Sequence, residues 1–557
     1  MNPRKTEESI QFFYVRWSSE NPMVCSQCGA PVEYLYNDGG RMVITLQGTI
    51  KLYTLYYICT NGACTFSQPF TLPQEIVLPY KHYGLDVWRW IITSHVEFHD
   101  NAGAIAKRLK AYHELDISPN TVKAVIETFL VANSEEADQE TFRRVQASGK
   151  IFLSLDGQRP NNGESGLWLF IDTITNRIVH MAYLKSAGWE LLAEIFHKIE
   201  KKYGVSIQAV LSDHQQNIIK AVKEALPQAA HQFCHYHFVK NLHRAINALD
   251  AHLHVTLSIA INNLYICHVP QAQAVCSYAG QELNLRTWLT PLVMDLTRLL
   301  LGKTRDFDIF AGFNLYEHLG HYVDLLDTLL EKTKPIERLT SLLERTSAAL
   351  KQLLARLNPL YTTVKVLIPL FNELRSILGG ETVPKAEIRA QATQWRDKLR
   401  TQYIAESGHA PDPKMKFKRI TAEASLADVL AEWIRLFSTH ERGLFQYLEI
   451  KGLPRSNVAL EQLFSLETHH FRVASGNAQV GNLVRVKGGE LCVALQNYDP
   501  DRLTETLIKS DRMTIKSGLE EFRQRHKVQT ASWHTNQPKA LEIHQLTKKT
   551  EEMLSKP

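Results

Sequence analysis

Two aspartates stand at the downstream ends of short apolar segments. Residues 150–157 read Lys-Ile-Phe-Leu-Ser-Leu-Asp-Gly and contain Asp156, and residues 207–213 read Ile-Gln-Ala-Val-Leu-Ser-Asp and end at Asp213. A short and nearly continuous apolar run is typical of a central strand that is covered on both faces. Two such strands can place their carboxylates side by side at one edge of a sheet, where oxygen ligands suit a divalent metal ion. The pattern therefore predicts a metal site of the nuclease type.

A third carboxylate follows much later in the chain. Pro454-Arg455-Ser456-Asn457 precedes Val-Ala-Leu-Glu-Gln-Leu-Phe at residues 458–464, which predicts a capped helix that carries Glu461. Each acid also has an ordinary interpretation. Asp156 could simply end a strand, Asp213 could be the N-cap of a following helix, and Glu461 could be a solvated helix residue. The case for a site depends on the three acids together with the order of the strands.

Four cysteines near the N-terminus have the spacing of metal ligands. Cys25 and Cys28 are separated by two residues, Cys59 and Cys64 are separated by four, and residues 42–58 between the pairs have the composition of a β-hairpin around Gly48. Two cysteine turns at the ends of a hairpin can bring four thiolates into the tetrahedron that structural Zn²⁺ prefers. The alternative is four unpaired, partly buried thiols.

The next segment has the signals of two short helices joined by a turn. Residues 104–109 have helical spacing, and after a turn-like stretch Ser118 is a natural N-cap with Pro119 at the first helical position. This order is that of a helix-turn-helix, in which Asn120, Thr121 and Lys123 would face a DNA groove. An ordinary helical hairpin is the alternative.

Length and composition limit the number of domains, the class of protein and its possible partners. A chain of 557 residues predicts three or more domains, and 44% apolar with 22% charged residues is typical of globular proteins. The net charge of +5 permits a nucleic-acid partner without arguing for one. We expect neither a membrane span nor a secretory signal, because no apolar run reaches the required length. The sparse cysteines favour a reducing compartment.

The segment after the first aspartate strand alternates between strands and helices. We expect strands at residues 166–172 and 177–184, a helix at 189–203, the Asp213 strand, a helix at 217–226 and a strand at 230–233. The order β-β-β-α-β-α-β is that of the ribonuclease H-like fold. The predicted fold class is therefore α/β.

The segment after this core has mainly helical patterns. Residues from about 240 to 440 have helical spacing, with a basic segment at 414–419 that is either a phosphate contact or a solvated loop. The predicted domains are a zinc-ribbon-like domain, a helix-turn-helix domain, the first part of the catalytic core, an all-α insertion, the second part of the core and a polar C-terminal tail. Their ranges are residues 1–78, 79–145, 146–240, 241–444, 445–500 and 501–557.

Residues 150 to about 487 resemble the Mutator-like transposases and their bacterial insertion-sequence relatives. Leu-Ser-Asp at residues 211–213 is followed by a Cys-x-x-His signature, to which Cys234 and His237 correspond, and then by a large helical insertion. The third acidic residue of that family lies on a helix after the insertion, commonly behind an asparagine, and Asn457 with Glu461 fits this pattern. Arg472 fits a basic residue that is often found one helix further on, and by this resemblance it would bind DNA.

The resemblance implies a DDE site that consists of Asp156, Asp213 and Glu461, with Glu467 as a rival for the third position. Two Mg²⁺ ions would stabilise the entering and leaving oxygens of an in-line displacement at phosphorus. Asp156 would contact both ions, and the other two acids one each. Cys234 and His237 would have a structural or substrate-positioning role, because thiol and imidazole are poorer Mg²⁺ ligands than carboxylate.

The function implied is that of a DNA transposase which binds the terminal repeats of its element, cleaves strands and joins them to target DNA. Its partners would be double-stranded terminal-repeat and target DNA, and its synaptic complex a homodimer or larger. It would act in the cytoplasm and nucleoid of a prokaryote, or in a eukaryotic nucleus. The alternatives are a domesticated transposase that regulates by binding DNA, and a ribonuclease H-type nuclease without joining activity.

Overall fold

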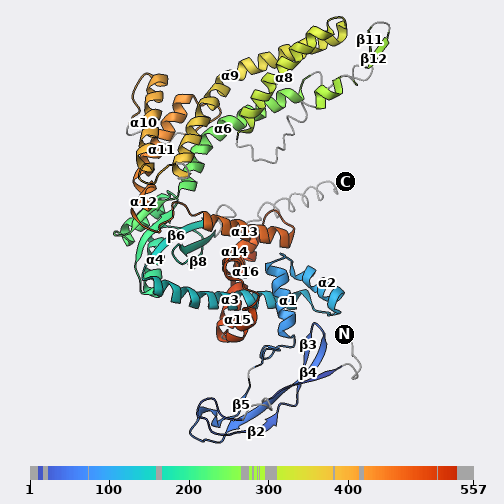
Figure 1. The fold of residues 1–557 in the computed structure, drawn as a ribbon, viewed down its shortest axis with the longest axis vertical. Coiled ribbons are helices and arrows are strands. Elements are labelled where there is room, and N and C mark those ends of the chain that lie inside the picture. The colour runs from blue at the N-terminus through green and yellow to red at the C-terminus, as the bar shows by residue number, and fades with distance from the viewer. Residues whose placement is uncertain are drawn as a thin grey trace, which may run out of the picture. The chain divides into compact units, whose positions relative to one another are not determined.

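The chain forms two compact units in the computed structural model, and each is described by itself (Figure 1). The first unit comprises Met1–Val210, Asn217–Ala229 and Asn457–Pro557, and the second comprises Leu211–Gln216 and Ala230–Ser456. The structure describes residues 10–16, 23–72, 74–158, 166–264, 275–278, 281–284, 287, 289–294, 310–379, 383–412, 419–510 and 512–535. Residues 414–418 of the predicted basic segment lie outside these ranges.

The first unit begins with a sheet built around one long strand. β4 (Gly48–Cys59) pairs with β1 (Gln11–Val15), β2 (Val32–Asn37), β3 (Arg41–Thr45) and β5 (Phe70–Thr71), and only β1 is parallel to it. The predicted hairpin around Gly48 is confirmed as β3–β4. Gly48 has a φ of 139°, a conformation that glycine adopts without strain and that closes the turn.

Three helices follow, and their ends correspond to sequence signals. α1 (Leu85–Val96) leads to α2 (Ala102–His113), where the side chain of Asn101 accepts a hydrogen bond from the Ala104 amide. α3 (Pro119–Ser148) begins at the N-cap Ser118, whose Oγ accepts from the Thr121 amide at 3.1 Å. The three helices share an apolar core that includes Trp88, Leu109 and Phe129.

The central sheet has five strands in the order β10-β9-β6-β7-β8. β6 (Ile151–Gln158), β7 (Gly166–Asp172) and β8 (Arg177–Leu184) are antiparallel neighbours, and β9 (Ile207–Ser212) and β10 (Ala230–Phe233) follow on the other side of β6. The amide of Ile151 donates to the carbonyl of Ser206 at 3.1 Å. Because this bond joins the starts of β6 and β9, the two strands run in the same direction.

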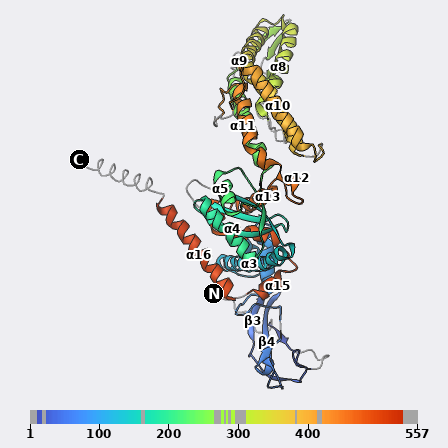
Figure 2. The ribbon, with the colours of Figure 1, turned by 90° about the vertical axis from the view of Figure 1, so that its left-hand side faces the viewer.

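Helices cover both faces of this sheet. Leu153 and Leu155 of β6 pack in the apolar cluster that contains α4 (Trp189–Tyr203) and α5 (Gln216–Ala225). Successive residues of a strand point to opposite faces, so Asp156 points to the other face, on which α13 (Val458–Ser475) contacts β6. Figure 2 shows α4 and α5, which share the apolar cluster, above α3 in that view.

The chain after α13 continues as helices packed on the same core. α14 (Gly481–Asn497) packs on β7 and β8, and α15 (Leu503–Lys509) and α16 (Arg512–Thr535) pack against α3. Both α15 and α16 lie in the predicted polar tail, and Phe522 of α16 is buried.

The second unit contains long helices and one small hairpin. Its helices are α6 (His235–Asn262), α8 (Ala311–Thr333), α9 (Glu337–Gly379), α10 (Ile388–Ser407), α11 (Leu426–Leu444) and α12 (Gln446–Glu449), and β11 (Val275–Tyr278) pairs with β12 (Gln281–Asn284). The helical character predicted for residues 240–440 agrees with these elements. No helix in the described part of the chain has the length and apolar character that crossing a membrane requires.

A buried aspartate fixes the approach of α8 to α6. The carboxylate of Asp250, on α6, accepts hydrogen bonds from the amides of Gly312 at 3.0 Å and Phe313 at 2.7 Å, at the start of α8. This contact satisfies amides of the first turn that have no partner within the helix. A Cβ at Gly312 would lie 2.1 Å from the carbonyl oxygen of Asp250, so only glycine permits this approach.

We expect Gly312→Ala to destabilise the second unit, because the added methyl group meets backbone that cannot move aside. Overpacking of this kind costs about 1–3 kcal/mol or more, measured as a fall in the midpoint of thermal or urea unfolding of the full chain. Gly320→Ala is the matched control on the same helix. A Cβ at Gly320 meets no atom within 4 Å, and the alanine should stabilise the helix by up to about 1 kcal/mol. Equal effects of the two variants would contradict this interpretation.

Candidate active site and zinc cluster

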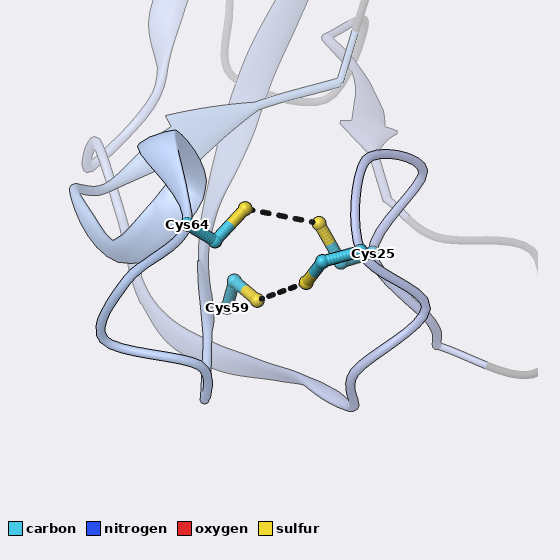
Figure 3. Close-up of side chains that lie close together, drawn as sticks. Cys25, Cys59 and Cys64 are labelled. Atoms are coloured by element: carbon cyan, nitrogen blue, oxygen red, sulfur yellow. Dashed lines mark hydrogen bonds between the residues drawn. The ribbon is translucent and has the colours of Figure 1, made fainter.

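The four N-terminal cysteines converge at one end of the first sheet. Their sulfur atoms all lie within 4.8 Å of one another, with 3.7 Å between Cys25 and Cys64 and 3.5 Å between Cys28 and Cys59. Figure 3 shows the thiols of Cys25, Cys59 and Cys64 pointing toward a common centre. A closed set of four thiolates fits structural Zn²⁺ and leaves no open coordination position for catalysis.

Local turns shape both cysteine pairs. In the first pair, the Cys25 amide donates to the Ala30 carbonyl at 2.8 Å and Gly29 adopts a φ of 72°. The wider gap of the second pair is bridged by Asn61, whose carbonyl accepts from the Cys64 amide at 3.0 Å. A backbone hydrogen bond with Ala30 lowers the pKa of Cys28 to about 7, which favours the thiolate that a metal requires.

Two predicted catalytic carboxylates meet within the first unit. The carboxylate oxygens of Asp156, on β6, and Glu461, in the first turn of α13, lie within 4.8 Å of each other. Both residues are half-buried, and Oδ1 of Asp156 accepts from the Gly157 amide at 2.7 Å. A Cβ at Gly157 would lie 2.3 Å from the Trp168 ring, so this strand end requires glycine. Two charged carboxylates at this separation repel each other, and a cation between them offsets that repulsion.

Glu467, the rival for the third position, has a different environment. Its side chain is fully buried on α13, where Oε2 accepts from the Thr468 hydroxyl at 3.2 Å. Burial raises the pKa of Glu467 to about 8, so the carboxyl is mostly protonated at neutral pH. A neutral buried acid is a poor cation ligand, and among the described residues Glu467 belongs to no group with metal-ligand spacing.

Asp213 belongs to the second unit and follows the last residue of β9. Its Oδ2 accepts from the Gln215 side chain at 2.7 Å, while Oδ1 is buried without a hydrogen-bond partner in the described part of the chain. A buried carboxylate oxygen without a donor is costly unless a ligand compensates it. The residue lines a hollow of about 410 Å³ together with His237, Arg244, Arg435 and other residues of the second unit.

The predicted signature residues lie at the start of α6. Cys234 is buried at the N-cap position, and its amide donates to the Ser212 carbonyl at 2.8 Å, which links the end of β9 to α6. Cys234 thus has a structural position, and His237 lines the hollow beside Asp213.

Two of the three histidines that sequence reasoning missed, His214 and His440, line this hollow. The rings of His214 and His440 stack at 3.9 Å, and His231 bonds Ser212 at 2.8 Å. Burial and, to a smaller extent, the neighbouring His214 lower the pKa of both His231 and His440 to about 3. His214 directly follows Asp213 and could have been noted, but His440 comes from α11, far along the chain, and no local pattern marks it.

The predicted DNA-facing residues lie on two helices of the first unit. Asn120, Thr121 and Lys123 lie in the first turns of α3, and Lys123 forms an ion pair with Glu127 at 3.7 Å. Arg472 was expected one helix beyond Glu461, and this is wrong. α13 extends to Ser475, so Arg472 lies on the same helix, and its Nε donates to the Ala478 carbonyl at 3.1 Å.

Comparison with known families gives one match. The model of the MULE transposase domain matches residues 177–241, from the start of β8 to the first turns of α6. This segment contains Asp213, Cys234 and His237, and the match supports a transposase function of the Mutator-like kind. None of the curated proteins compared with the chain matches it.

We expect the purified protein to contain one zinc ion per chain and Cys59→Ser to lose it, because three thiolates do not close the tetrahedron. Elemental analysis and the midpoint of thermal unfolding measure the two effects. Cys234→Ser serves as control, since serine is a good N-cap residue and should keep the zinc. A wild-type protein free of zinc, or loss of zinc from the control, would refute the assignment.

The buried histidines predict a loss of stability in mild acid. The unfolded chain binds protons on these imidazoles below about pH 6.5, whereas the folded chain does so only near pH 3. Stability therefore falls as the pH drops through this window, by up to about 1.4 kcal/mol per pH unit for each histidine. His440→Gln should flatten the slope of melting temperature against pH between about 7.5 and 5.5. His318→Gln, at an exposed position, should not change this slope. Equal slopes in the wild type and both variants would argue against the buried histidines as the cause of the acid sensitivity.

Proposed function

We propose that the protein is a DNA transposase that cleaves and joins strands with the triad Asp156, Asp213 and Glu461. The observation that carries the proposal is the meeting of the Asp156 and Glu461 carboxylates, which the sequence separates by the whole of the second unit. The third member follows β9, the strand that neighbours and parallels β6.

The donor set fits Mg²⁺, which prefers carboxylate oxygens and keeps some of its water. Asp156, Asp213 and Glu461 would hold two ions, and these supply charge stabilisation for an in-line displacement at phosphorus. The residues themselves position the ligands. The amide of Gly157 orients the Asp156 carboxylate, and the unpartnered Oδ1 of Asp213 is available for a cation.

The strand order supports a ribonuclease H-like core as part of this proposal. Three antiparallel strands, β6 to β8, followed by two strands on the other side of β6 give the predicted order. The helical residues between the two parts of the core would be the insertion. The cysteine cluster and the α2–α3 pair would bind the terminal repeats as a zinc ribbon and a helix-turn-helix, and a homodimer or larger assembly would hold two DNA ends.

Two other functions fit less well. A domesticated regulator that only binds DNA has no need for acids that meet at a strand end, yet Asp156 and Glu461 lie together. A simple nuclease has little use for a separate metal ribbon and a second unit of long helices. The family match to a transposase domain favours strand transfer over both.

We expect Asp156→Asn, Asp213→Asn and Glu461→Gln each to abolish cleavage and joining while DNA binding is retained. The assay incubates the protein with labelled terminal repeats, target plasmid and Mg²⁺ and measures joined products. Loss of one metal-binding carboxylate should lower the rate by orders of magnitude, because an amide supplies no negative charge.

Glu467→Gln is the matched control on the same helix as Glu461. The Glu467 carboxyl is already mostly neutral at pH 7, so the amide replaces a group of similar shape and charge and activity should persist. Persistent joining by the triple acid variant would end the proposal, and inactivity of Glu467→Gln with normal stability would reassign the third acid.

A further inference from the structure

A basic hollow lies between three helices of the first unit, and neither Asp156 nor Glu461 lines it. It has a volume of about 660 Å³ and is lined by α3, α14 and α16. Five of its lining side chains are basic and only Glu127 is acidic. The basic residues of this hollow are Lys123, Lys487, Arg523, His526 and Lys527.

The packing of α16 creates the hollow. Arg525 of α16 forms a buried ion pair with Glu490 of α14 at 2.6 Å, and its guanidinium lies over the Tyr183 ring at 4.6 Å. Gly518 approaches α3 so closely that a Cβ would lie 2.6 Å from Val131. These contacts anchor α16 by one face and leave Arg523 and Lys527 exposed at the hollow.

The helix α14 is interrupted at the hollow. Lys487 has φ −147° and ψ 15°, which is not helical, and its side chain is half-buried there. Burial lowers the pKa of Lys487, Glu127 opposes this shift, and Lys123 adds to it. An amine that loses water contacts and faces another cation is stabilised by an anionic ligand.

Two of these basic residues have no ion-pair partner among the described residues. Glu127 pairs with Lys123 at 3.7 Å, and within the described part of the chain Arg523 and Lys527 form no ion pair. Leu483, Val486 and Phe522 supply apolar lining, which reduces solvent screening of the nearby cations. The hollow therefore favours a ligand with negative charge spread over several groups.

We propose that this hollow binds phosphate groups of the backbone of double-stranded DNA. The inference rests on the proposed function, from which the DNA comes. Lys123 belongs both to the hollow and to the start of α3 that is proposed to face DNA. It lines the hollow, and it follows Asn120 and Thr121 in the first turns of α3. Half of the lining side chains are basic and only one, Asn482, is a side-chain amide, so the lining suits phosphate contact rather than the reading of bases.

The test compares duplex binding by the full-length protein and by Arg523→Gln/Lys527→Gln, measured as fluorescence anisotropy over a series of salt concentrations. Each phosphate contact contributes about one unit to the slope of log affinity against log salt, so the double variant should lower the slope by about two. Affinity should fall alike for terminal-repeat and unrelated duplexes. Both residues are exposed, and an unchanged melting temperature verifies the fold.

Lys516→Gln is the matched control, because Lys516 is exposed on α16 and does not line the hollow. It should retain the wild-type affinity and slope. If the double variant also retains both while the wild type binds and cleaves DNA, the inference fails and the proposed function stands. If the wild type binds no duplex, this contradicts the proposed function itself, and the inference that rests on it is contradicted as well.

A second measurement separates a DNA contact from a site for a small anion. Labelling of Lys487 by an amine-reactive reagent is followed by mass spectrometry with duplex, with inorganic phosphate and without ligand. Protection by duplex at concentrations near its dissociation constant supports the proposal. Protection by inorganic phosphate but not by duplex would overturn it in favour of a free-anion site.

Discussion

The close approach of α14 to the central sheet is the constraint on which the carboxylate pair depends. A Cβ at Gly489 would lie 2.6 Å from the sulfur of Met181, and one at Gly488 would lie 2.6 Å from a carboxylate oxygen of Glu467. Two consecutive glycines therefore allow α14 to pack against β8 and α13. α13, which carries Glu461, packs on both α14 and β6, which carries Asp156. The close packing of α14 therefore sets the distance between Glu461 and Asp156.

A buried polar network stabilises the packing of α14 against the central sheet. The Tyr183 hydroxyl donates to Glu490 at 3.0 Å and accepts from the Gly489 amide at 2.9 Å, while Arg525 pairs with the same glutamate. Burial and the charge of Glu490 raise the pKa of Tyr183 well above its usual value, so the hydroxyl keeps its proton. Removing one partner of a buried ion pair commonly costs about 3–5 kcal/mol. The C-terminal helix α16 thus stabilises the same packing that positions the acids.

The acids of this protein differ in how their charge is compensated. Asp172 is fully buried. Its carboxylate accepts hydrogen bonds from the Phe152 and Thr175 amides and from the Thr175 hydroxyl, and these bonds compensate its charge. Asp250 is compensated in the same way by the amides at the start of α8. Asp156 and Glu461 are only half-buried and lie close to each other. Two neighbouring carboxylates raise each other's energy, and this distinguishes a cation site from a structural acid.

Local patterns in the sequence determined the elements of the core. The strands at residues 166–172, 177–184 and 230–233 and the helix at 189–203 agree with their predicted bounds, because short apolar runs and helical periodicity indicate which segments are buried. The spacing of the cysteines likewise indicated their cluster, since short turns fix each pair.

Only the tertiary structure decided which acids and bases share a site. Glu461 and Glu467 lie on one helix, about 120° apart around its axis, and periodicity alone does not say which of them faces β6. The stacking of His214 with His440, and the hollow between α3, α14 and α16, join residues from distant segments. Such contacts arise from the packing of whole helices, which no local spacing encodes.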